Sequence, residues 1–309
     1  MKLCSFTQVD ILTKNIDFDI FIASTGYESR ASFLARQNIQ SKEKFVLAFR
    51  DNHTNKNRVK NDKFFREENF KFIDMSGSQN EKIFDLLNSS IANNPQEKIS
   101  ILIDYSSMTR VWYGAIISYL SGCALKNKSI YAYFSYSVSE FNEPLSKESE
   151  TFHFYPIDSF CHLTVPTKPT ALIAGLGYEK KRVFGLREYF DAEALYLFYT
   201  DDNPFTQYVR NKNREVIDSV DSKNIFPYLL NDLTYTKMLL QDLYDHLKDN
   251  FRIIIAPCGP KPFTLLSFII ASEAPNIDVW RISASDTDEH IVEKKESGEI
   301  ITVELVYGE

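Results

Sequence analysis

The chain contains one pattern written twice, and this repeat constrains its fold more than any other feature. The segment FIASTGYESR at 21–30 is echoed by IAGLGYEKKR at 173–182. The apolar run around Ile103 returns around Ile255, about 150 residues later. The tetrapeptide NKNR also occurs twice, shortly after an apolar run each time. Because the matches keep their order along the chain, we predict an internal duplication of one folding unit.

Within each copy, short apolar runs alternate with segments of helical periodicity. The predicted strands cover 17–25, 44–51, 70–76, 99–106 and 129–137 in the first copy, and 170–176, 194–200, 225–230, 251–258 and 277–285 in the second. The predicted helices cover 29–37, 58–68, 79–94 and 110–122, then 181–190, 206–220, 232–250 and 261–273. Strands that are apolar on both faces and alternate with helices indicate parallel sheets covered by right-handed crossovers. We therefore predict an α/β protein with two tandem Rossmann-like domains related by pseudo-twofold symmetry.

The expected domain limits follow from proline content and turn signals. Residues 1–152 should form the first repeat, and 153–170 a linker that is rich in proline and lacks a helical period. Residues 171–309 should form the second repeat. After Ser285 the sequence predicts a C-terminal β-hairpin that turns at Ser297 and Gly298.

Composition excludes several classes of function. The net charge of −7 argues against broad binding to duplex DNA, although a local pocket for a phosphate ligand is compatible with it. The four cysteines form no CxxC pair and the five histidines have no metal-ligand spacing, so we expect no metal site. Apolar runs are too short to cross a membrane, and we expect a cytoplasmic protein. Dinucleotide-binding, P-loop and GxSxG motifs are absent, so no cofactor is implied.

The GYE turn is the first of two candidate ligand loops in each copy, because open α/β sheets bind ligands where strand order reverses, at the carboxyl ends of strands. Gly26 and Gly177 suit a left-handed backbone or a close approach, which either a tight turn or a ligand explains. The other residues have more than one interpretation each. Tyr27 and Tyr178 stack on a base or lie buried. Glu28 and Glu179 cap a helix, contact a ribose or base, or act in acid/base chemistry. Arg30, Lys180, Lys181 and Arg182 clamp phosphate or face solvent.

The second candidate loop follows the fourth strand and differs between copies. The first copy has Asp104, Ser106, Ser107, Thr109 and Arg110, whereas the second has CGPKP at 258–262. Glycine and lysine at the start of a helix can cradle a phosphate, and hydroxyls with an arginine can do the same. Helix capping by the serine or threonine residues is the alternative interpretation.

Two loops of this kind, here TGYESR after the first strand and PCGPKPFTLL after the fourth, make the chain resemble the CARF superfamily of Rossmann-like domains. The related SAVED domain is similar in fusing two CARF-like units in one chain. The resemblance implies a shared pocket for a cyclic oligonucleotide between the two halves. It also implies that Gly259 and Lys261 are ligand-loop residues, with Thr109 and Arg110 in the corresponding turn of the first copy.

We therefore expect a sensor that binds a nucleotide-type second messenger and regulates a partner effector, in antiviral defence. A hydrolase acting on phosphodiester or glycosidic bonds is the first alternative, with Asp104, Ser106 and Arg110 as candidate catalytic residues. A scaffold subunit of a multi-protein complex, without catalysis, is the second.

Overall fold

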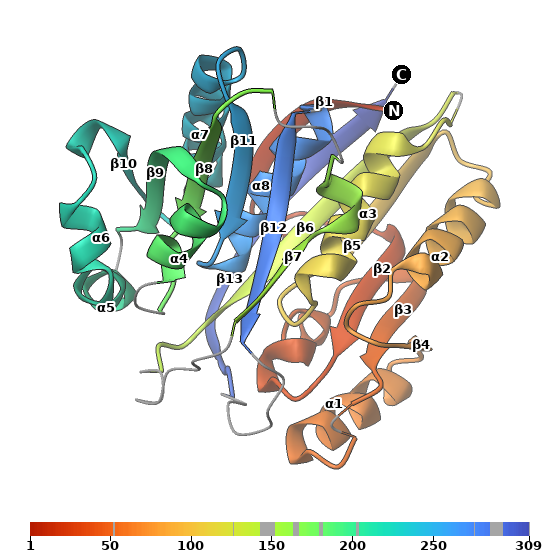
Figure 1. Ribbon diagram of the computed structural model, residues 1–309. Helices are drawn as coiled ribbons and strands as arrows, with labels where there is room; N and C mark the ends of the chain where they lie inside the picture. Colours follow the sequence, from red (N-terminus) through yellow and green to blue (C-terminus); the bar gives the residue numbers. More distant parts are fainter. Residues whose placement is uncertain are drawn as a thin grey trace. The chain divides into compact units, whose positions relative to one another are not determined.

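The computed structural model describes residues 1–51, 53–125, 127–142, 152–162, 167–178, 182–201, 204–274, 276–284 and 293–308. The chain forms two compact units, which we call unit 1 (residues 1–142 and 292–309) and unit 2 (residues 143–291). Each unit has a mostly parallel β-sheet flanked by helices, so the predicted α/β fold is confirmed (Figure 1).

Unit 1 has a seven-stranded sheet in the order β1-β13-β6-β5-β2-β3-β4. Its strands are β1 (Lys2–Val9), β2 (Phe18–Thr25), β3 (Ser41–Phe49), β4 (Lys71–Met75), β5 (Lys98–Asp104), β6 (Ser129–Ser139) and β13 (Glu296–Gly308). Its helices are the 3₁₀ helices η1 (Ser29–Ser32) and η2 (Leu34–Arg36), and α1 (Lys56–Glu67), α2 (Glu81–Ala92) and α3 (Arg110–Gly122). Every residue of β2 is buried, as expected for a central strand covered on both faces.

Unit 2 has a six-stranded sheet in the order β10-β9-β8-β11-β12-β7. Its strands are β7 (Phe152–Pro156), β8 (Thr170–Gly175), β9 (Ala192–Thr200), β10 (Ile225–Tyr228), β11 (Arg252–Pro257) and β12 (Ile277–Ala284). Its helices are η3 (Asp158–Phe160), α4 (Arg182–Tyr189), α5 (Pro204–Lys212), α6 (Arg214–Asp218), η4 (Ser222–Asn224), α7 (Leu233–Leu247) and α8 (Lys261–Glu273).

The two sheets share one topology. The order β6-β5-β2-β3-β4 in unit 1 is matched strand for strand by β12-β11-β8-β9-β10 in unit 2, and all of these neighbours are parallel. One antiparallel strand extends each order, β13 beside β6 and β7 beside β12. Numbered along each repeat, the order is 3-2-1-4-5, which matches the first five strands of the Rossmann order 3-2-1-4-5-6. The repeat in the sequence therefore corresponds to a repeat in strand order.

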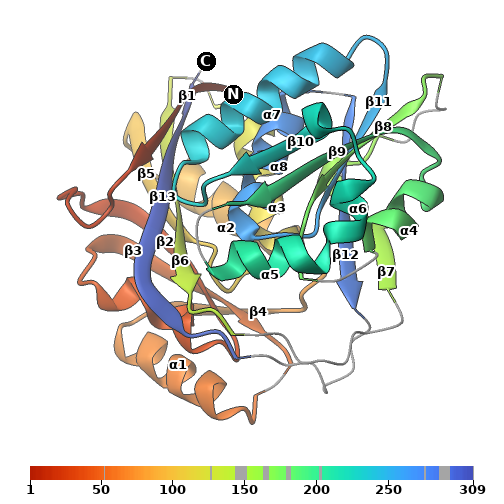
Figure 2. The same ribbon diagram turned by 90° about the vertical axis from the view of Figure 1, so that its left-hand side faces the viewer.

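The C-terminal hairpin was predicted wrongly. Ser297 and Gly298 lie inside the single strand β13, at an irregularity of its register against β6, and Gly298 has a φ of 93°. The two residues thus belong to a bulge, which a glycine with positive φ also explains. Strand β13 does not extend unit 2 but lies between β1 and β6 of unit 1, antiparallel to both (Figure 2).

The other domain limits also differ from the prediction. The first stretch of unit 1 ends at Asn142 instead of residue 152. The expected linker at 153–170 contains most of β7, which pairs with β12, and η3, whose Phe160 stacks on Phe268 of α8 with ring centroids 4.7 Å apart. Pro156 is the last residue of the edge strand β7 and Pro169 lies directly before β8, positions that proline tolerates. The helix expected at 29–37 is replaced by η1 and η2.

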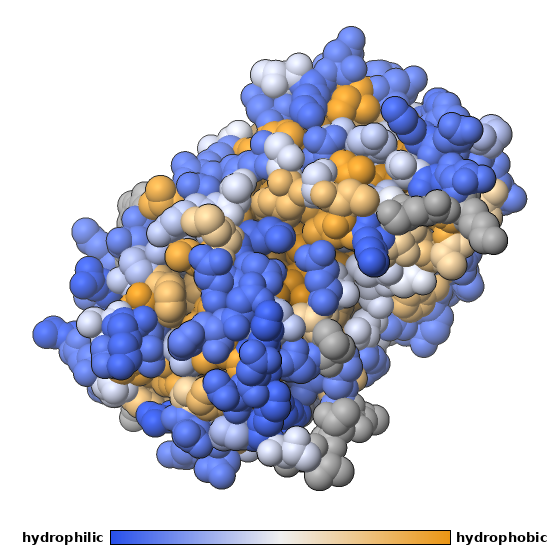
Figure 3. Space-filling view, turned by 90° about the horizontal axis from the view of Figure 1, so that it is seen from above, coloured by the Kyte–Doolittle hydropathy of each residue, from blue (hydrophilic) through white to orange (hydrophobic). Residues whose placement is uncertain are grey.

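Polar residues cover most of the molecular face in Figure 3, with apolar residues gathered in patches between them. This distribution is typical of a folded protein, whose surface always retains some apolar area. Within the described residues, no helix is both long and apolar enough to cross a lipid bilayer.

Candidate functional site

In each unit the two predicted loops leave neighbouring strands at the same edge of the sheet. Strands β2 and β5 are parallel neighbours, with Ile22 opposite Ile103. Strands β8 and β11 are likewise neighbours, with Gly175 opposite Pro257. The strand order reverses between these strands, so both GYE turns and both second loops lie at the topological switch points where α/β sheets bind ligands.

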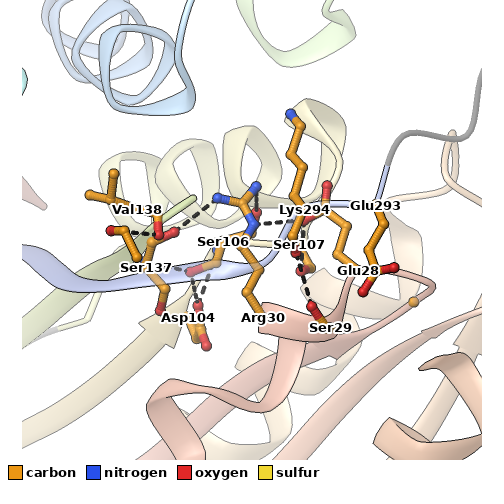
Figure 4. A network of polar contacts seen from close by, with 12 residues as sticks. Glu28, Ser29, Arg30, Asp104, Ser106, Ser107, Ser137, Val138, Glu293 and Lys294 are labelled. Carbon is orange, nitrogen blue, oxygen red and sulfur yellow. Dashed lines mark hydrogen bonds and ion pairs between the residues drawn. The ribbon is translucent and has the colours of Figure 1, made fainter. Parts of the chain in front are cut away.

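Arg30 occupies the centre of the loops in unit 1, with its side chain fully buried. Its Nε donates to Oε2 of Glu28 over 2.9 Å, and its two terminal nitrogens donate to the carbonyls of Ser137 (2.8 Å) and Ser106 (3.0 Å) (Figure 4). The guanidinium also lies over the ring of Tyr136, 5.1 Å from the centroid. The planar fork of arginine suits this role, because it satisfies several acceptors in fixed directions. Arg30 therefore ties three segments of unit 1 together, and the solvated-face and phosphate-clamp interpretations both lose support.

Burial opposes the charge on Arg30, but the neighbouring Tyr136 and Glu28 outweigh it and raise the pKa of Arg30 above its ordinary value. The guanidinium is thus always charged. Glu28 is itself largely buried, and its Oε2 also accepts a hydrogen bond from the Ser107 hydroxyl over 3.1 Å. Because Ser107 belongs to the second loop, Glu28 joins the GYE turn to that loop.

Asp104 and Ser106 form a second buried cluster beneath the same loops. The Asp104 Oδ1 accepts from both the backbone N–H (3.0 Å) and the hydroxyl (2.5 Å) of Ser106, and the Ser106 Oγ accepts from the Ser137 N–H (2.7 Å). Both residues are almost completely buried. These contacts fix the turn after β5 and join it to β6, which favours a structural role over the candidate catalytic one.

Sequence reasoning missed an asparagine that holds the GYE turn in each unit. The Nδ2 of Asn61 donates to the carbonyls of Gly26 (3.1 Å) and Glu28 (2.8 Å). The Nδ2 of Asn213 donates to the carbonyl of Gly177 over 2.8 Å. Asn61 and Asn213 have the same separation along the chain as Ile103 and Ile255, a signal that could have identified them.

The NKNR match pointed to the wrong pairing. Asn55 of the first NKNR caps α1, accepting hydrogen bonds from the backbone N–H groups of Asn57 and Arg58. The second NKNR instead lies where α5 ends and α6 begins, and its Asn213 corresponds to Asn61. Spacing along the chain therefore identifies corresponding residues of the two repeats better than the shared tetrapeptide does.

Tyr27 and Gly26 also have structural explanations. Tyr27 is mostly buried, and burial together with the Glu28 carboxylate raises the pKa of its phenol to about 12, with Arg30 opposing. Gly26 does not have a positive φ, so the left-handed interpretation is wrong for this residue. A Cβ at Gly26 would lie 3.3 Å from the Phe49 ring, which indicates a tight but not forbidden approach.

The residues of the second loop that remain partly exposed in unit 1 are Ser107, Thr109 and Arg110. Thr109 is the N-cap of α3 but makes no side-chain capping bond, and the first turn of α3 carries no acidic residue. The N-terminus of such a helix favours an anion. The loop after β4 lies alongside, since a Cβ on Gly77 would be 3.9 Å from Cγ2 of Thr109.

In unit 2 the corresponding loops pack against each other through backbone. The Cys258 N–H donates to the Gly175 carbonyl over 2.9 Å. A Cβ on Gly259 would lie 2.6 Å from the Leu176 carbonyl oxygen, so this glycine is explained by contact between the two loops. Lys261 is the first residue of α8 and is partly exposed.

The remaining predicted residues of unit 2 are placed as follows. Tyr178 makes an edge-to-face contact with Tyr208, with centroids 5.6 Å apart. Arg182, the counterpart of Arg30 along the chain, is buried at the start of α4. Glu179, Lys180 and Lys181 lie outside the described residues. The Asp104–Ser106 part of the unit 1 cluster is not repeated, because Ala256 and Cys258 stand at the corresponding positions.

The site thus separates into an internal part and an external part. Glu28, Arg30, Asp104 and Ser106 hold the loops in place, while Ser107, Thr109 and Arg110 at the N-terminus of α3 remain partly exposed. Such an external set can bind a phosphate-bearing molecule. The described residues contain no group of three or more His, Cys, Asp or Glu side chains that could hold a metal ion, and no disulfide joins the four cysteines.

Comparison with known proteins gives no family. No family model and no curated protein matches the chain. One structure similar to this chain is the cytoplasmic domain of a prokaryotic cation chloride cotransporter, with 8% identity, a TM-score of 0.24, and coverage of 89% of this chain and 98% of that one. A TM-score of this size carries no argument about fold or function.

Proposed function

We propose that the protein is a sensor, which binds a nucleotide-type second messenger, in particular a cyclic oligonucleotide, and passes the bound state to a partner effector. The observation that carries this proposal is the repeated 3-2-1-4-5 strand order, with a GYE turn and a second loop at the switch point of each unit. The resemblance of this arrangement to CARF and SAVED domains supports the ligand class. It also supports a setting in antiviral defence.

The contacts that we propose for the ligand are the partly exposed residues of the second loops. Ser107, Thr109 and Arg110 would hold one phosphate at the N-terminus of α3, where the helix dipole favours negative charge. Gly259 and Lys261 would act in the same way at the N-terminus of α8. Arginine and lysine bind phosphate through charged hydrogen bonds, which are stronger than neutral ones.

Binding without turnover fits the internal cluster better than hydrolysis does. A nucleophile or general base must reach the reacting atoms. Asp104 and Ser106 are instead buried and hydrogen bonded to each other and to β6. We therefore place the sensor ahead of the hydrolase.

Isothermal titration of the protein with a panel of cyclic di-, tri- and tetranucleotides tests the proposal. We expect at least one of them to bind, and Arg110→Ala and Lys261→Ala each to weaken that binding about 10- to 100-fold, the value of a charged hydrogen bond. Lys63→Ala is the matched control, since Lys63 pairs with Glu67 on the exposed surface of α1, with 76% of its side chain accessible.

Each other outcome selects a different function. Failure of the whole panel to bind contradicts the sensor. If chromatography shows that a bound nucleotide is converted into linear or deglycosylated products, the hydrolase is selected. Stable copurification with a partner protein in the absence of any nucleotide binding selects the scaffold.

A further inference from the structure

Unit 2 is inserted into the chain of unit 1. The chain leaves unit 1 after Asn142, at the end of β6, and returns to it at Val292, ahead of β13. Two covalent connections therefore link unit 1 to unit 2. Strand β6 runs parallel to β5, so its end lies at the same edge of the sheet as the candidate ligand loops.

The segments that flank these connections are hydrogen bonded to each other within unit 1. The Glu140 N–H donates to the Lys295 carbonyl over 2.9 Å, and the Asn142 Nδ2 donates to the Glu293 carbonyl over 3.2 Å. The Ser297 hydroxyl adds a bond of 3.1 Å to the Val138 carbonyl. The departing and returning strands are thus held side by side at their point of exit.

The GYE turn holds the same point from its other side. The Ser29 hydroxyl (3.3 Å) and the Arg30 N–H (3.5 Å) both donate to the Lys294 carbonyl, and the Arg30 guanidinium donates to the Ser137 carbonyl (Figure 4). Arg30 therefore contacts the departing strand through its side chain and the returning segment through its backbone. Through Glu28, the same arginine is also linked to Ser107 of the ligand loop.

We propose that Ser29 and Arg30 couple occupancy of the site in unit 1 to the two connections that lead to unit 2. This inference rests on the proposed function, because it assigns a regulatory consequence to the ligand. A ligand that contacts Ser107 or Glu28 changes the position of the Glu28 carboxylate that accepts a hydrogen bond from Arg30. Because the guanidinium is a rigid fork, a displacement of Arg30 also changes its contacts with Ser137 and with the Lys294 segment. Contacts run without a break from Ser107 through Glu28 and Arg30 to Ser137 and Lys294. By linkage, the state of the two connections then alters ligand affinity by the same factor.

A first experiment measures the coupling without any ligand. Amide hydrogen exchange is followed in the full chain for wild type, Ser29→Ala, Arg30→Lys and the control Ser121→Ala, whose hydroxyl bonds a carbonyl within α3. We expect the Glu140 amide to exchange about two- to tenfold faster in Ser29→Ala and in Arg30→Lys, and to be unchanged in the control. Unchanged exchange at Glu140 in Ser29→Ala and in every folded Arg30 variant overturns the inference.

A second experiment repeats the exchange measurement with a cyclic oligonucleotide that binds in the titration. Slower exchange at the Glu140 amide on binding supports the coupling. Binding with no change at this amide overturns the coupling and leaves the proposed function intact. If no member of the panel binds, the proposed function fails, and the exchange of the ligand-free variants still decides whether the turn and the connections are coupled.

Discussion

Oε2 of Glu28 lies 2.9 Å from Nε of Arg30, and the arginine side chain is fully buried. An ion pair of this kind does not guarantee stability, since both charges have lost water. Here each terminal nitrogen of the guanidinium also donates a hydrogen bond, one to the carbonyl of Ser137 and one to that of Ser106. The pair therefore acts through what it joins, the GYE turn, the loop after β5 and the end of β6.

Arg30→Ala should destabilise unit 1 by about 3 to 5 kcal/mol, because it leaves the Glu28 carboxylate buried beside unsatisfied carbonyls. Urea unfolding measures the change in the free energy of unfolding. Arg214→Ala is the control, since Arg214 pairs with Asp218 over 3.4 Å with 80% of its side chain exposed; it should change the free energy by less than about 0.5 kcal/mol. A similar small effect for both variants would contradict a structural role for Arg30.

Asn61→Asp should destabilise unit 1 more than Asn61→Ala does. The alanine variant leaves the Gly26 and Glu28 carbonyls without their donor, which should lower the free energy of unfolding by about 1 to 3 kcal/mol. The aspartate keeps the size of the side chain but sets a buried carboxylate against those two carbonyls. Lys60→Ala, at an exposed position of the same helix, is the control. Equal stability of wild type and Asn61→Asp would show that the amide does not hold the turn.

Two glycines of unit 2 should respond to alanine in opposite directions. A Cβ on Gly259 would lie 2.6 Å from the Leu176 carbonyl oxygen, so the two loops must move apart, and we expect a loss of about 1 to 3 kcal/mol. Gly185 lies in α4 with nothing within 4 Å of such a Cβ. Gly185→Ala should therefore stabilise the helix by about 0.5 to 1 kcal/mol. Thermal unfolding followed by circular dichroism compares them, and a stable Gly259→Ala would disprove the tight contact.

Lowering the pH should remove a contribution of Asp19 to the free energy of unfolding. Asp19 lies near the start of β2, at the end of the strands opposite the candidate loops. Burial raises the pKa of this carboxyl, but hydrogen bonds from Lys42 (2.7 Å) and from Ser100 outweigh it and hold the pKa below 3.8. The contribution is thus present above that value and is lost as the pH falls through the folded-state pKa. Asp19→Asn should be less stable than wild type near neutral pH, with the difference shrinking below about pH 4.

Urea unfolding at about pH 7 and about pH 3 gives the two differences for Asp19→Asn. Asp85→Asn, on the exposed side of α2, serves as the control. A difference between wild type and Asp19→Asn that is the same at both pH values would show that the carboxylate contributes nothing as a charged group.

The sequence predicted the repeat, the strand alternation and the meeting of the loops, because each depends on local apolar periodicity and on strand order. It failed at β13, because an edge-adjacent antiparallel strand has the same alternating pattern whichever sheet it joins. Ser297 and Gly298 are also turn residues in their own right, and a bulge uses the same glycine preference. Pairing between segments as distant as β1 and β13 leaves no local signal.

At the candidate site, the sequence identified the residues but not the direction in which they point. Glu28, Arg30 and Asp104 belong to residue types that usually lie at the surface, yet they are buried and hydrogen bonded. Asn61 was missed because an asparagine inside a helix forms no local motif. Its spacing from Asn213 marks it as part of the repeat, but only the structure shows that it donates to the Gly26 carbonyl. Burial of polar residues depends on tertiary contacts, which periodicity does not encode.

Unit 1 should fold after unit 2 is removed, provided that β13 is kept. Joining Asn142 to Glu293 through a short glycine–serine linker is feasible, because the Asn142 side chain already bonds the Glu293 carbonyl over 3.2 Å. This shortened chain retains β13 between β1 and β6 and should unfold cooperatively in urea. Residues 1–142 alone lack β13, so β1 loses its only pairing in the described sheet and β6 keeps only its pairing with β5. This fragment should aggregate or remain unfolded. If residues 1–142 alone unfold cooperatively, with a free energy of unfolding equal to that of the joined chain, β13 is not part of the folding unit.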